Sequence, residues 1–594
     1  MMVNMQNKNR FIRMIALCLC LCISIGMLAS CDILFGNENP PVENPPAGDN
    51  NNTTTPPTGN NGNNNGGNNG GNNGNGDKVE QQPTYSDKGI FFSSSAEDGG
   101  DGTIDHPYNS FDVIGELEIV PGTYIYIECG SKFLGSLYLS GIEGTVEEPV
   151  TVTSYGKGKK PVIDGNDLVG GGVLHIANCS NLVVEKLEIT DSATNEDDRR
   201  GVLVTCDNNN GGSDVVTYTN ITLKDLYIHD IQGFRDAENS GMAMWSKITG
   251  GIHLWSTDGL GRLDGFTVTE CEITEVSNVG IATWQKVGYT EKGELSVKVV
   301  SPYSDTFKDY AHLNVHIDGN EISHIGKNAI FARNLLGGLI EHNIVHDTAK
   351  YCVSGNSIVT RSVDGTVIQY NEGYRNLARA RDEDGKLQDG CMLDADLDSK
   401  YTVWQYNYSH DNSFGLFINC TTEGKDVAIV RYNLSVNDKG NKGIIYINYE
   451  AAGIYVYNNT IVTAYDTEYI IQSNGTGRVS YFYNNLIYNR SDNAKIGISG
   501  NAQMTAENNL VYNEYGSSID GLDYFKTLNA SGIYDRDPMF VGYLQEDSIL
   551  GIDNQHTYML DAKSPALGVG KQIDAVADFF GNEYKKSIGF YCGN

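Results

Sequence analysis

Two aspartates, Asp394 and Asp396, are the residues of this sequence whose spacing most directly suggests chemistry. They lie in the segment Asp389-Gly-Cys-Met-Leu-Asp-Ala-Asp396. In a strand, residues two apart point to the same face, with Cα atoms about 6.5 to 7 Å apart. Hydrolysis of a glycosidic bond uses two carboxyl groups about 5 to 10 Å apart. We therefore expect Asp394 and Asp396 to form a hydrolytic pair, with three alternative partners: Asp389, Asp411 and Glu423.

A column of side chains is expected beside this pair, because four other segments share its alternating pattern. The segments begin at Gly241, Gly280, Ala329, Gly390 and Gly415, and their second and fourth residues are apolar or small. Those residues should face inward and the fifth outward. The outward column then reads Trp245, Trp284, Arg333, Asp394 and Asn419, and the coil between Arg333 and Asp394 offers Gly355 and Asn356.

This column has the chemistry of a sugar-binding groove. Aromatic faces pack against sugar rings, and polar side chains bond their hydroxyl groups. The candidate substrate-binding residues are Trp245, Trp284, Asn356, Asn419 and Asp411. The alternative is that inserted loops cover both tryptophans, since the coils that carry them are long.

A recurring asparagine indicates the elements that would position these residues. From residue 320 onward an asparagine returns before a short apolar run, with gaps of 23, 28, 36, 26, 26, 26 and 24 residues, at Asn320, Asn343, Asn371, Asn407, Asn433, Asn459, Asn485 and Asn509. A period in the twenties with strand-sized, turn-rich units predicts a parallel β-solenoid. We expect the stacked amides to bond one another inside turns, which is a structural role.

The first 84 residues are expected to comprise a targeting signal and a flexible tether. Basic residues precede an apolar run from Met14 to Leu28, which is typical of a secretory signal. The run ends in Leu28-Ala29-Ser30-Cys31, which resembles a bacterial lipobox, so we expect Cys31 to be lipidated. The predicted domains are a signal peptide at 1–31, a disordered Asn/Gly/Pro-rich tether at 32–84 and a β-helix at 85–594.

The amino-acid composition limits the kinds of partner that the protein is expected to bind. The formal net charge is −33, so nucleic acid is an unfavourable partner. The eight cysteines beyond the signal show no close metal-type spacing, and we expect no obligatory disulfide framework. We expect a monomer at a bacterial cell surface or in the periplasm, held to the membrane by its N-terminal lipid alone.

Several segments resemble the bacterial right-handed parallel β-helix proteins of the pectate-lyase-like superfamily, especially their carbohydrate-active members. The similar segments are Gly89-Ile-Phe-Phe-Ser, Val120-Pro-Gly-Thr-Tyr, Pro149-Val-Thr-Val-Thr-Ser-Tyr-Gly, Asp389 to Asp396, Gln405 to Asn412, Asp537-Pro-Met-Phe and Ile588-Gly-Phe-Tyr. The resemblance covers residues 88 to 594 and implies an all-β, right-handed parallel β-helix of about 10–13 coils with loop insertions. Fold alone does not settle activity.

The resemblance keeps three functions open. The favoured one is a surface polysaccharide-degrading glycoside hydrolase that uses Asp394 and Asp396 and needs no cofactor. The second is a pectate-type lyase, in which Asp394, Asp396 and Asp398 bind Ca²⁺ and Arg333 is the catalytic base, with Lys247, Lys286, Arg379 or Arg381 in reserve. The third is a non-catalytic glycan-binding or adhesin-like protein.

Overall fold

The computed structural model describes residues 84–594 apart from 236–246, 290–294, 353–354, 381–386, 421–426, 449–452, 475–478, 517, 543–547, 574–576 and 594. Lys88–Asn594 form one compact unit. The predicted signal, Cys31 and nearly all of the tether lie outside the described residues, so those assignments stay predictions. Among the described helices, none is both long and apolar enough to cross a membrane.

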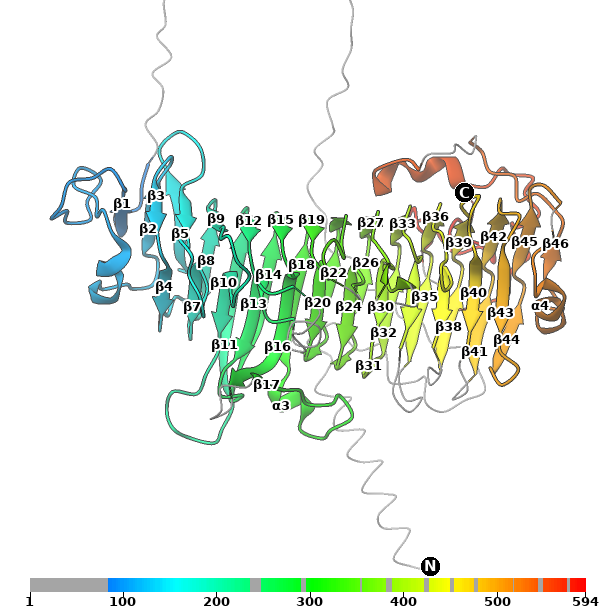
Figure 1. The fold of residues 1–594 in the computed structure, drawn as a ribbon, viewed down its shortest axis with the longest axis horizontal. Coiled ribbons are helices and arrows are strands. Elements are labelled where there is room, and N and C mark those ends of the chain that lie inside the picture. The colour runs from blue at the N-terminus through cyan, green and yellow to red at the C-terminus, as the bar shows by residue number, and fades with distance from the viewer. Residues whose placement is uncertain are drawn as a thin grey trace, which may run out of the picture. The chain divides into compact units, whose positions relative to one another are not determined.

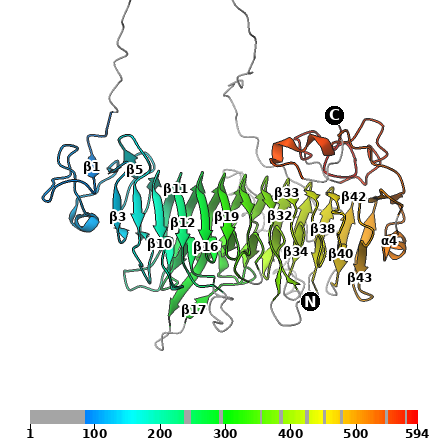
Figure 2. The ribbon, with the colours of Figure 1, turned by 45° about the horizontal axis from the view of Figure 1, so that its top comes forward.

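The compact unit is a stack of coils, each of which passes in turn through three parallel sheets (Figure 1). Successive strands of one sheet are separated in sequence by one whole coil, as in β2, β5 and β8 of the first sheet. Figure 2 shows the same strands advancing along one axis from β3 to β43. This arrangement confirms the predicted all-β parallel β-helix.

The first sheet, sheet A, has 17 strands. Its strands are β1 (Gly89–Phe92), β2 (Tyr124–Glu128), β5 (Val150–Tyr155), β8 (Leu182–Glu185), β11 (Val216–Lys224), β14 (Gly261–Thr269), β18 (His312–Asp318), β21 (Leu335–Leu336), β22 (Leu339–Glu341), β25 (Val363–Asp364), β26 (Val367–Gln369), β31 (Ser399–Lys400), β32 (Thr402–Gln405), β35 (Ala428–Arg431), β38 (Ile454–Tyr457), β41 (Ser480–Tyr483) and β44 (Met504–Glu507).

The second sheet, sheet B, has 14 strands. Its strands are β3 (Lys132–Leu134), β6 (Val162–Asp164), β9 (Glu188–Asp191), β12 (Tyr227–Ile231), β15 (Glu272–Val276), β19 (Glu321–Ile325), β23 (Ile344–His346), β27 (Glu372–Tyr374), β33 (Tyr408–His410), β36 (Leu434–Val436), β39 (Thr460–Val462), β42 (Leu486–Asn489), β45 (Leu510–Asn513) and β46 (Ile533–Tyr534).

The third sheet, sheet C, has 13 strands. One of them, β17, pairs antiparallel with β16, and the other 12 described strands belong to successive coils. This agrees with the expected 10–13 coils. Its strands are β4 (Leu137–Ser140), β7 (Leu174–Ala177), β10 (Arg200–Thr205), β13 (Gly250–Ser256), β16 (Val279–Tyr289), β17 (Leu295–Lys298), β20 (Ile330–Arg333), β24 (Ile358–Arg361), β30 (Leu393–Ala395), β34 (Phe417–Asn419), β37 (Ile445–Ile447), β40 (Tyr469–Ser473) and β43 (Lys495–Ile498).

A few elements lie outside these sheets. They are the hairpin of β28 (Arg379–Ala380) and β29 (Leu387–Gln388), the short helices η2 (Phe111–Glu116), α3 (Phe307–Tyr310), α4 (Leu522–Leu528) and η3 (Ile552–Tyr558). The C-terminal segment, red in Figure 1, folds back beside the later strands. It is fastened there by the Tyr408 hydroxyl, which donates to the Ile549 carbonyl at 3.0 Å, and by Asn458 Nδ2, which donates to the Ser587 carbonyl at 2.8 Å.

Aliphatic side chains stack in register along the interior of the coils. On sheet C, Ile281 pairs with Ile330, and the row continues through Ile358 and Leu393 to Phe417. All five side chains are inaccessible to solvent. Each such side chain contributes about 1.5 to 3 kcal/mol relative to an exposed one. The interior row therefore fixes which neighbouring residues point outward.

The asparagine ladder forms as predicted and extends beyond the repeats recognised in the sequence. Asn371 Nδ2 donates to Asn407 Oδ1 at 3.0 Å, and Asn407 Nδ2 donates to Asn433 Oδ1 at the same distance. Comparable bonds join every successive pair from Asn320 to Asn509, and Asn509 Nδ2 bonds a further member, Asn529. Buried amides that bond one another and nearby carbonyls leave few polar groups unsatisfied.

Candidate active site

The two aspartates predicted as a pair lie on the outer side of sheet C. Leu393 and Ala395 of β30 belong to the interior core, and Asp394 stands between them on the opposite face. Asp396 follows directly, and its backbone N–H continues the ladder by donating to the Thr360 carbonyl at 3.0 Å. Because faces alternate along a strand, both carboxylates face outward.

Asp394 is almost enclosed. Its side chain is 7% exposed, and Asn356 Nδ2 donates to its Oδ2 at 2.7 Å. Its other oxygen, Oδ1, is buried and has no hydrogen-bond partner among the described residues. Burial raises the pKa of Asp394 well above its usual range, and the charges of Asp396 and Asp389 add to the rise. The carboxyl group therefore keeps its proton where an ordinary aspartate has lost it.

Asp396 has a different environment from its neighbour. Its side chain is 21% exposed, and its Oδ2 lies 3.2 Å from Nη1 of Arg361. The strand thus presents two carboxyl groups in different settings, one buried with a raised pKa and one paired with an arginine, and glycosidic bond cleavage uses two carboxyl groups with different roles.

Cationic side chains border the two carboxylates. Arg333 pairs with Arg361 on adjacent strands, and its guanidinium lies 4.6 Å from the centre of the Trp284 ring. Burial, and then the charge of Arg361, lower the pKa of Arg333 to about 9. The Lys247 ammonium lies 3.9 Å from the centre of the Phe331 ring. Burial lowers the Lys247 pKa to about 7, with a further contribution from Lys327, while Asp396 and Asp394 oppose the shift.

Two of the expected groove residues are placed differently from the prediction. Trp284 is 0% exposed, so the expectation that it faces solvent is wrong. Its burial agrees with the alternative that the tryptophan is covered, and the Arg333 side chain of β20 lies over its ring. Asn419 pairs with Ala395 on the interior side and is 1% exposed, so its predicted outward position is also wrong. The second tryptophan, Trp245, lies outside the described residues.

The cause of the Asn419 error is a register shift of one residue. Phe417, rather than Leu416 or Ile418, aligns with Leu393, so Ile418 takes the outward place beside Asp394. Such a shift moves every side chain of a strand to the other face.

The same register places Arg361 in the outward row. The alignment of Ile358 with Ile330 puts Arg361 beside Arg333, where the sequence analysis had offered Gly355 and Asn356. The spacing from Ser357 to Arg361 would have revealed this arginine.

Asp411 lies on another side of the coil. It follows β33 of sheet B, and its Oδ2 is 2.7 Å from His410 Nδ1. Asp411 is therefore wrong as a member of the groove that contains Asp394. Its carboxylate instead anchors a turn beneath the C-terminal segment, where the neighbouring Asn437 side chain bonds Ser548 at 3.0 Å.

The three aspartates expected to bind calcium in a lyase do not form a shared set of ligands. Asp398 lies in a turn with φ of 62°, beyond the end of β30. In the part of the chain that the structure describes, the His, Cys, Asp and Glu atoms close enough to share a metal ion belong to His316, Asp318 and Glu341 on sheet A. The donor set at Asp394, Asp396 and Asp398 therefore does not fit a three-carboxylate Ca²⁺ site.

Asn356 joins the pair to the segment that precedes it. Its Nδ2 donates to Asp394, and its Oδ1 accepts from the backbone N–H groups of Gly390 and Cys391 at 2.9 and 3.0 Å. The side chain is 2% exposed. Its predicted contact with substrate is replaced by a contact that orients Asp394 and holds the backbone next to Asp389.

Replacing Asn356 by alanine should lower kcat by roughly 10- to 100-fold, because an unfixed Asp394 is displaced from its productive position. The lost hydrogen bond stabilises the charged carboxylate, so the Asp394 pKa should rise further and the alkaline limb of the pH–rate profile should move to higher pH. Steady-state rates across pH check both effects. Asn493→Ala, an exposed asparagine elsewhere, is the control. An unchanged profile with normal kcat would contradict the positioning role.

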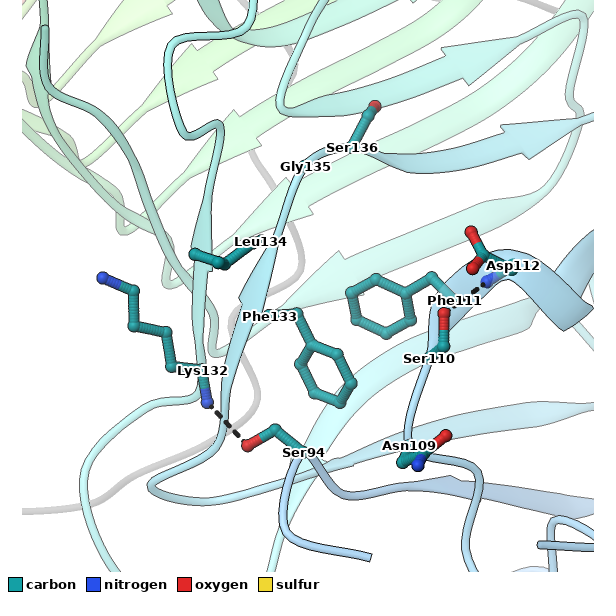
Figure 3. Close-up of a pocket in the computed structure, with 10 residues that line it drawn as sticks. All are labelled: Ser94, Asn109, Ser110, Phe111, Asp112, Lys132, Phe133, Leu134, Gly135 and Ser136. Atoms are coloured by element: carbon teal, nitrogen blue, oxygen red, sulfur yellow. Dashed lines mark hydrogen bonds between the residues drawn. The ribbon is translucent and has the colours of Figure 1, made fainter. Parts of the chain in front are cut away.

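Two cavities open on other parts of the described surface. One, of about 330 Å³, lies between η2 and β3 near the first coils (Figure 3). There Phe111 and Phe133 stack with ring centres 4.2 Å apart. The other, of about 660 Å³, lies over the outer side of sheet C. Neither cavity contains Asp394 or Asp396 among its lining residues.

Comparisons with known proteins agree with the fold, and a lacto-N-biosidase is similar to this chain in sequence. No family model matches the sequence. The chain is 26% identical over 530 residues to a lacto-N-biosidase of Bifidobacterium longum subsp. longum. The matched region covers 73% of this chain and 31% of the relative. The chain thus spans about a third of the length of the curated relative that it matches.

Solved structures give the same result for the fold. The native GH136 lacto-N-biosidase from Eubacterium ramulus matches with a TM-score of 0.51 and 23% identity, over 71% of this chain and 67% of that one. Its selenomethionine derivative matches with a TM-score of 0.50 and 22% identity. These matches confirm the expected right-handed parallel β-helix fold.

Proposed function

We propose that this protein is a glycoside hydrolase that cleaves an extracellular glycan, with Asp394 as the general acid and Asp396 as the nucleophile or base. The observation that carries the proposal is the contrast between the two carboxyl groups. One is buried with a raised pKa, and the other is paired with Arg361. The similarity to lacto-N-biosidases supports the same class of reaction and makes a lacto-N-bioside the first substrate to test.

The reaction follows from this geometry. Asp394 donates its proton to the oxygen of the leaving sugar, while Asp396 either attacks the anomeric carbon or deprotonates the attacking water. Arg361 Nη1 donates to Asp396 Oδ2 at 3.2 Å and orients it, and Asn356 holds Asp394 in place. Arg333 adds positive charge near Asp396, and Lys247, whose pKa is about 7, lies near both carboxyl groups. No cofactor takes part in this scheme.

The proposed location is outside the cytoplasm, at a bacterial cell surface or in the periplasm. The support is the signal-like N-terminus and the lipobox-like Cys31. A lipid on Cys31 would anchor the enzyme, and the Asn/Gly-rich segment would let the catalytic unit act on glycans away from the membrane. We propose that the enzyme acts as a monomer.

Incubation of the full-length protein with p-nitrophenyl lacto-N-bioside tests the function. We expect release of nitrophenolate and an intact disaccharide, without the ultraviolet absorbance of an unsaturated uronide. Appearance of that absorbance with uronate polymers would identify a lyase instead. Glycan binding without turnover of any bond would identify a non-catalytic binding protein. The anomer formed first distinguishes a nucleophilic from a basic role for Asp396.

A further inference from the structure

The cavity of about 660 Å³ on sheet C has the size and composition of a ligand site. It lies over β4, β7, β10 and β13 and is bordered by the β16–β17 hairpin. Its volume falls in the range of about 300 to 1,000 Å³ that is usual for small-molecule pockets. The lining residues that matter here are Tyr138, Gly171, His175, Arg200, Thr205 and Trp255.

One exposed and one nearly buried aromatic side chain line this cavity. Tyr138 is 52% exposed, and its ring lies 5.0 Å from that of His175. Trp255 is nearly buried, and the Arg200 guanidinium lies 4.6 Å from the centre of its ring. Arg200 is itself fixed, since its Nε donates to the Ile248 carbonyl at 2.6 Å. Flat rings on a rigid support are the usual platform for a sugar ring.

Polar groups suited to hydroxyls accompany the rings. The indole N–H of Trp255 has no acceptor among the described residues, although the side chain is only 5% exposed. Such a buried donor normally has a partner, so a ligand oxygen would satisfy it. His175 Nε2 lies 3.2 Å from the Thr205 hydroxyl. Burial, and then Arg200, lower the His175 pKa to about 4, so its ring is neutral at pH 7.

The charged residues that line the cavity, Asp198, Arg200, Asp207 and Lys286, include two of each sign. Asp198 pairs with Arg200 at 2.5 Å. Asp207 Oδ1 accepts from the Ser256 hydroxyl at 3.1 Å and from the Thr257 backbone N–H at 2.5 Å. The protein as a whole carries a net charge of −33, which disfavours an anionic ligand. A neutral, hydroxyl-rich ligand fits these conditions best.

The cavity and the aspartate pair lie on the same outer face of sheet C, and the outward residues between them are almost inaccessible to solvent. Residue pairing between adjacent strands leads from Tyr138 to His175, then through Leu203, His253, Ala282, Phe331 and Val359 to Asp394. His175 and Asp394 are six steps apart on this path, and each step is about 4.8 Å, so the separation is about 29 Å. From Trp255 on β13 to β30 the same count gives about 19 Å.

We propose that this cavity is a second carbohydrate site, which holds sugar residues of a long neutral glycan while a distant glycosidic bond of the same chain lies at Asp394 and Asp396. The inference rests on the proposed function for its substrate class. It adds that the preferred substrate is an extended chain lying along the coil axis, and that affinity rises when the chain is long enough to reach Trp255.

Blocking the cavity tests the proposal. A Cβ atom built on Gly171 meets no atom within 4 Å, and the Gly171 backbone is not left-handed, so the position accepts a side chain and Gly171→Trp should fill the cavity. Gly500→Trp is the matched control, because Gly500 has the same freedom but lies between β43 and β44. Tyr138→Ala removes the exposed aromatic face and serves as a second, independent variant.

The assay uses neutral oligosaccharides of increasing length that end in a lacto-N-bioside, with p-nitrophenyl lacto-N-bioside as the short substrate. We expect Gly171→Trp and Tyr138→Ala to raise KM for the longest chains by about tenfold, the effect of losing one good aromatic contact. The short substrate should react normally, and Gly500→Trp should behave as the unchanged protein. Normal KM for long chains in both cavity variants would overturn the proposal.

A binding measurement separates this inference from the proposed function. Calorimetric titration of Asp396→Asn with the longest oligosaccharide should show binding that Gly171→Trp weakens by about tenfold in the same background. If the unchanged protein cleaves nothing but this binding is present, the proposed function fails and the second site stands. If short and long oligosaccharides bind equally, the second site is wrong, whether or not cleavage occurs.

Discussion

Asp394→Asn is expected to reduce kcat by about 10²- to 10⁴-fold, which is the usual contribution of a general acid. Asparagine has nearly the same shape but cannot give its proton to a leaving sugar. The buried position favours a neutral side chain, so the substitution should not destabilise the fold. Steady-state kinetics on p-nitrophenyl lacto-N-bioside, together with thermal unfolding of the same sample, measure both effects.

The role of Asp394 as an acid also predicts the direction in which activity changes with pH. The acid works only while protonated, so activity should fall as pH rises through the Asp394 pKa, which burial has raised above that of an ordinary aspartate. That alkaline limb should therefore lie at higher pH than a normal carboxyl group would give. The residual activity of Asp394→Asn should no longer show this alkaline limb.

A matched substitution controls for general effects of removing a carboxylate. Asp466 is exposed and pairs with Lys439 at 2.8 Å, far along the chain from β30, so Asp466→Asn should keep full activity. If Asp394→Asn turned over substrate as fast as Asp466→Asn, the assignment of Asp394 as the acid would be refuted. Asp389 would then be the next carboxylate to test, because its charge also acts on Asp394.

Asn407→Ala should have the largest effect on stability, about 3 to 5 kcal/mol lost from the free energy of unfolding. Its side chain takes part in four buried hydrogen bonds. Nδ2 donates to the Ile368 carbonyl and to Asn433 Oδ1, and Oδ1 accepts from the backbone N–H and Nδ2 of Asn371. Alanine would leave at least two buried backbone groups unpaired, and each costs about 1 to 3 kcal/mol.

Thermal unfolding and hydrogen exchange can locate this loss. The N–H of Asn371 and neighbouring amides should exchange faster in Asn407→Ala, while coils remote from the substitution keep their protection. Asn554→Ala is the control, because Asn554 is exposed and its Nδ2 donates to a single carbonyl, that of Leu550. A melting temperature that falls no further than in this control would show that the ladder does not carry the stability assigned to it.

The sequence analysis identified the fold because two independent sequence patterns reveal the repeating coil. The returning asparagines gave the coil length, and alternating apolar residues such as Ile281 and Ile330 gave the interior row. The outward position of Asp394 and Asp396 follows from the same alternation. The absence of disulfides among the eight described cysteines likewise agrees with the expectation from their spacing.

The parts that were missed depend on information that alternation does not contain. Asn419 was misplaced because Leu416, Phe417 and Ile418 are all apolar, so the pattern could not choose between two registers. The burial of Trp284 depends on Arg333 above it and on residues far along the chain. The partners of Asp394, namely Asn356 and the charge of Lys247, lie 38 and 147 residues away and meet it only in the folded coil.

The asparagine ladder keeps the same geometry in coils of different length. Coils of 23 and 36 residues deliver their asparagines to the same row, at 2.8 Å from Asn320 to Asn343 and at 3.0 Å from Asn371 to Asn407. The additional residues of the longer coil include the β28–β29 hairpin that leads into Asp389. A coil can therefore gain or lose loop residues at this position while the ladder and the stacked strands keep their spacing.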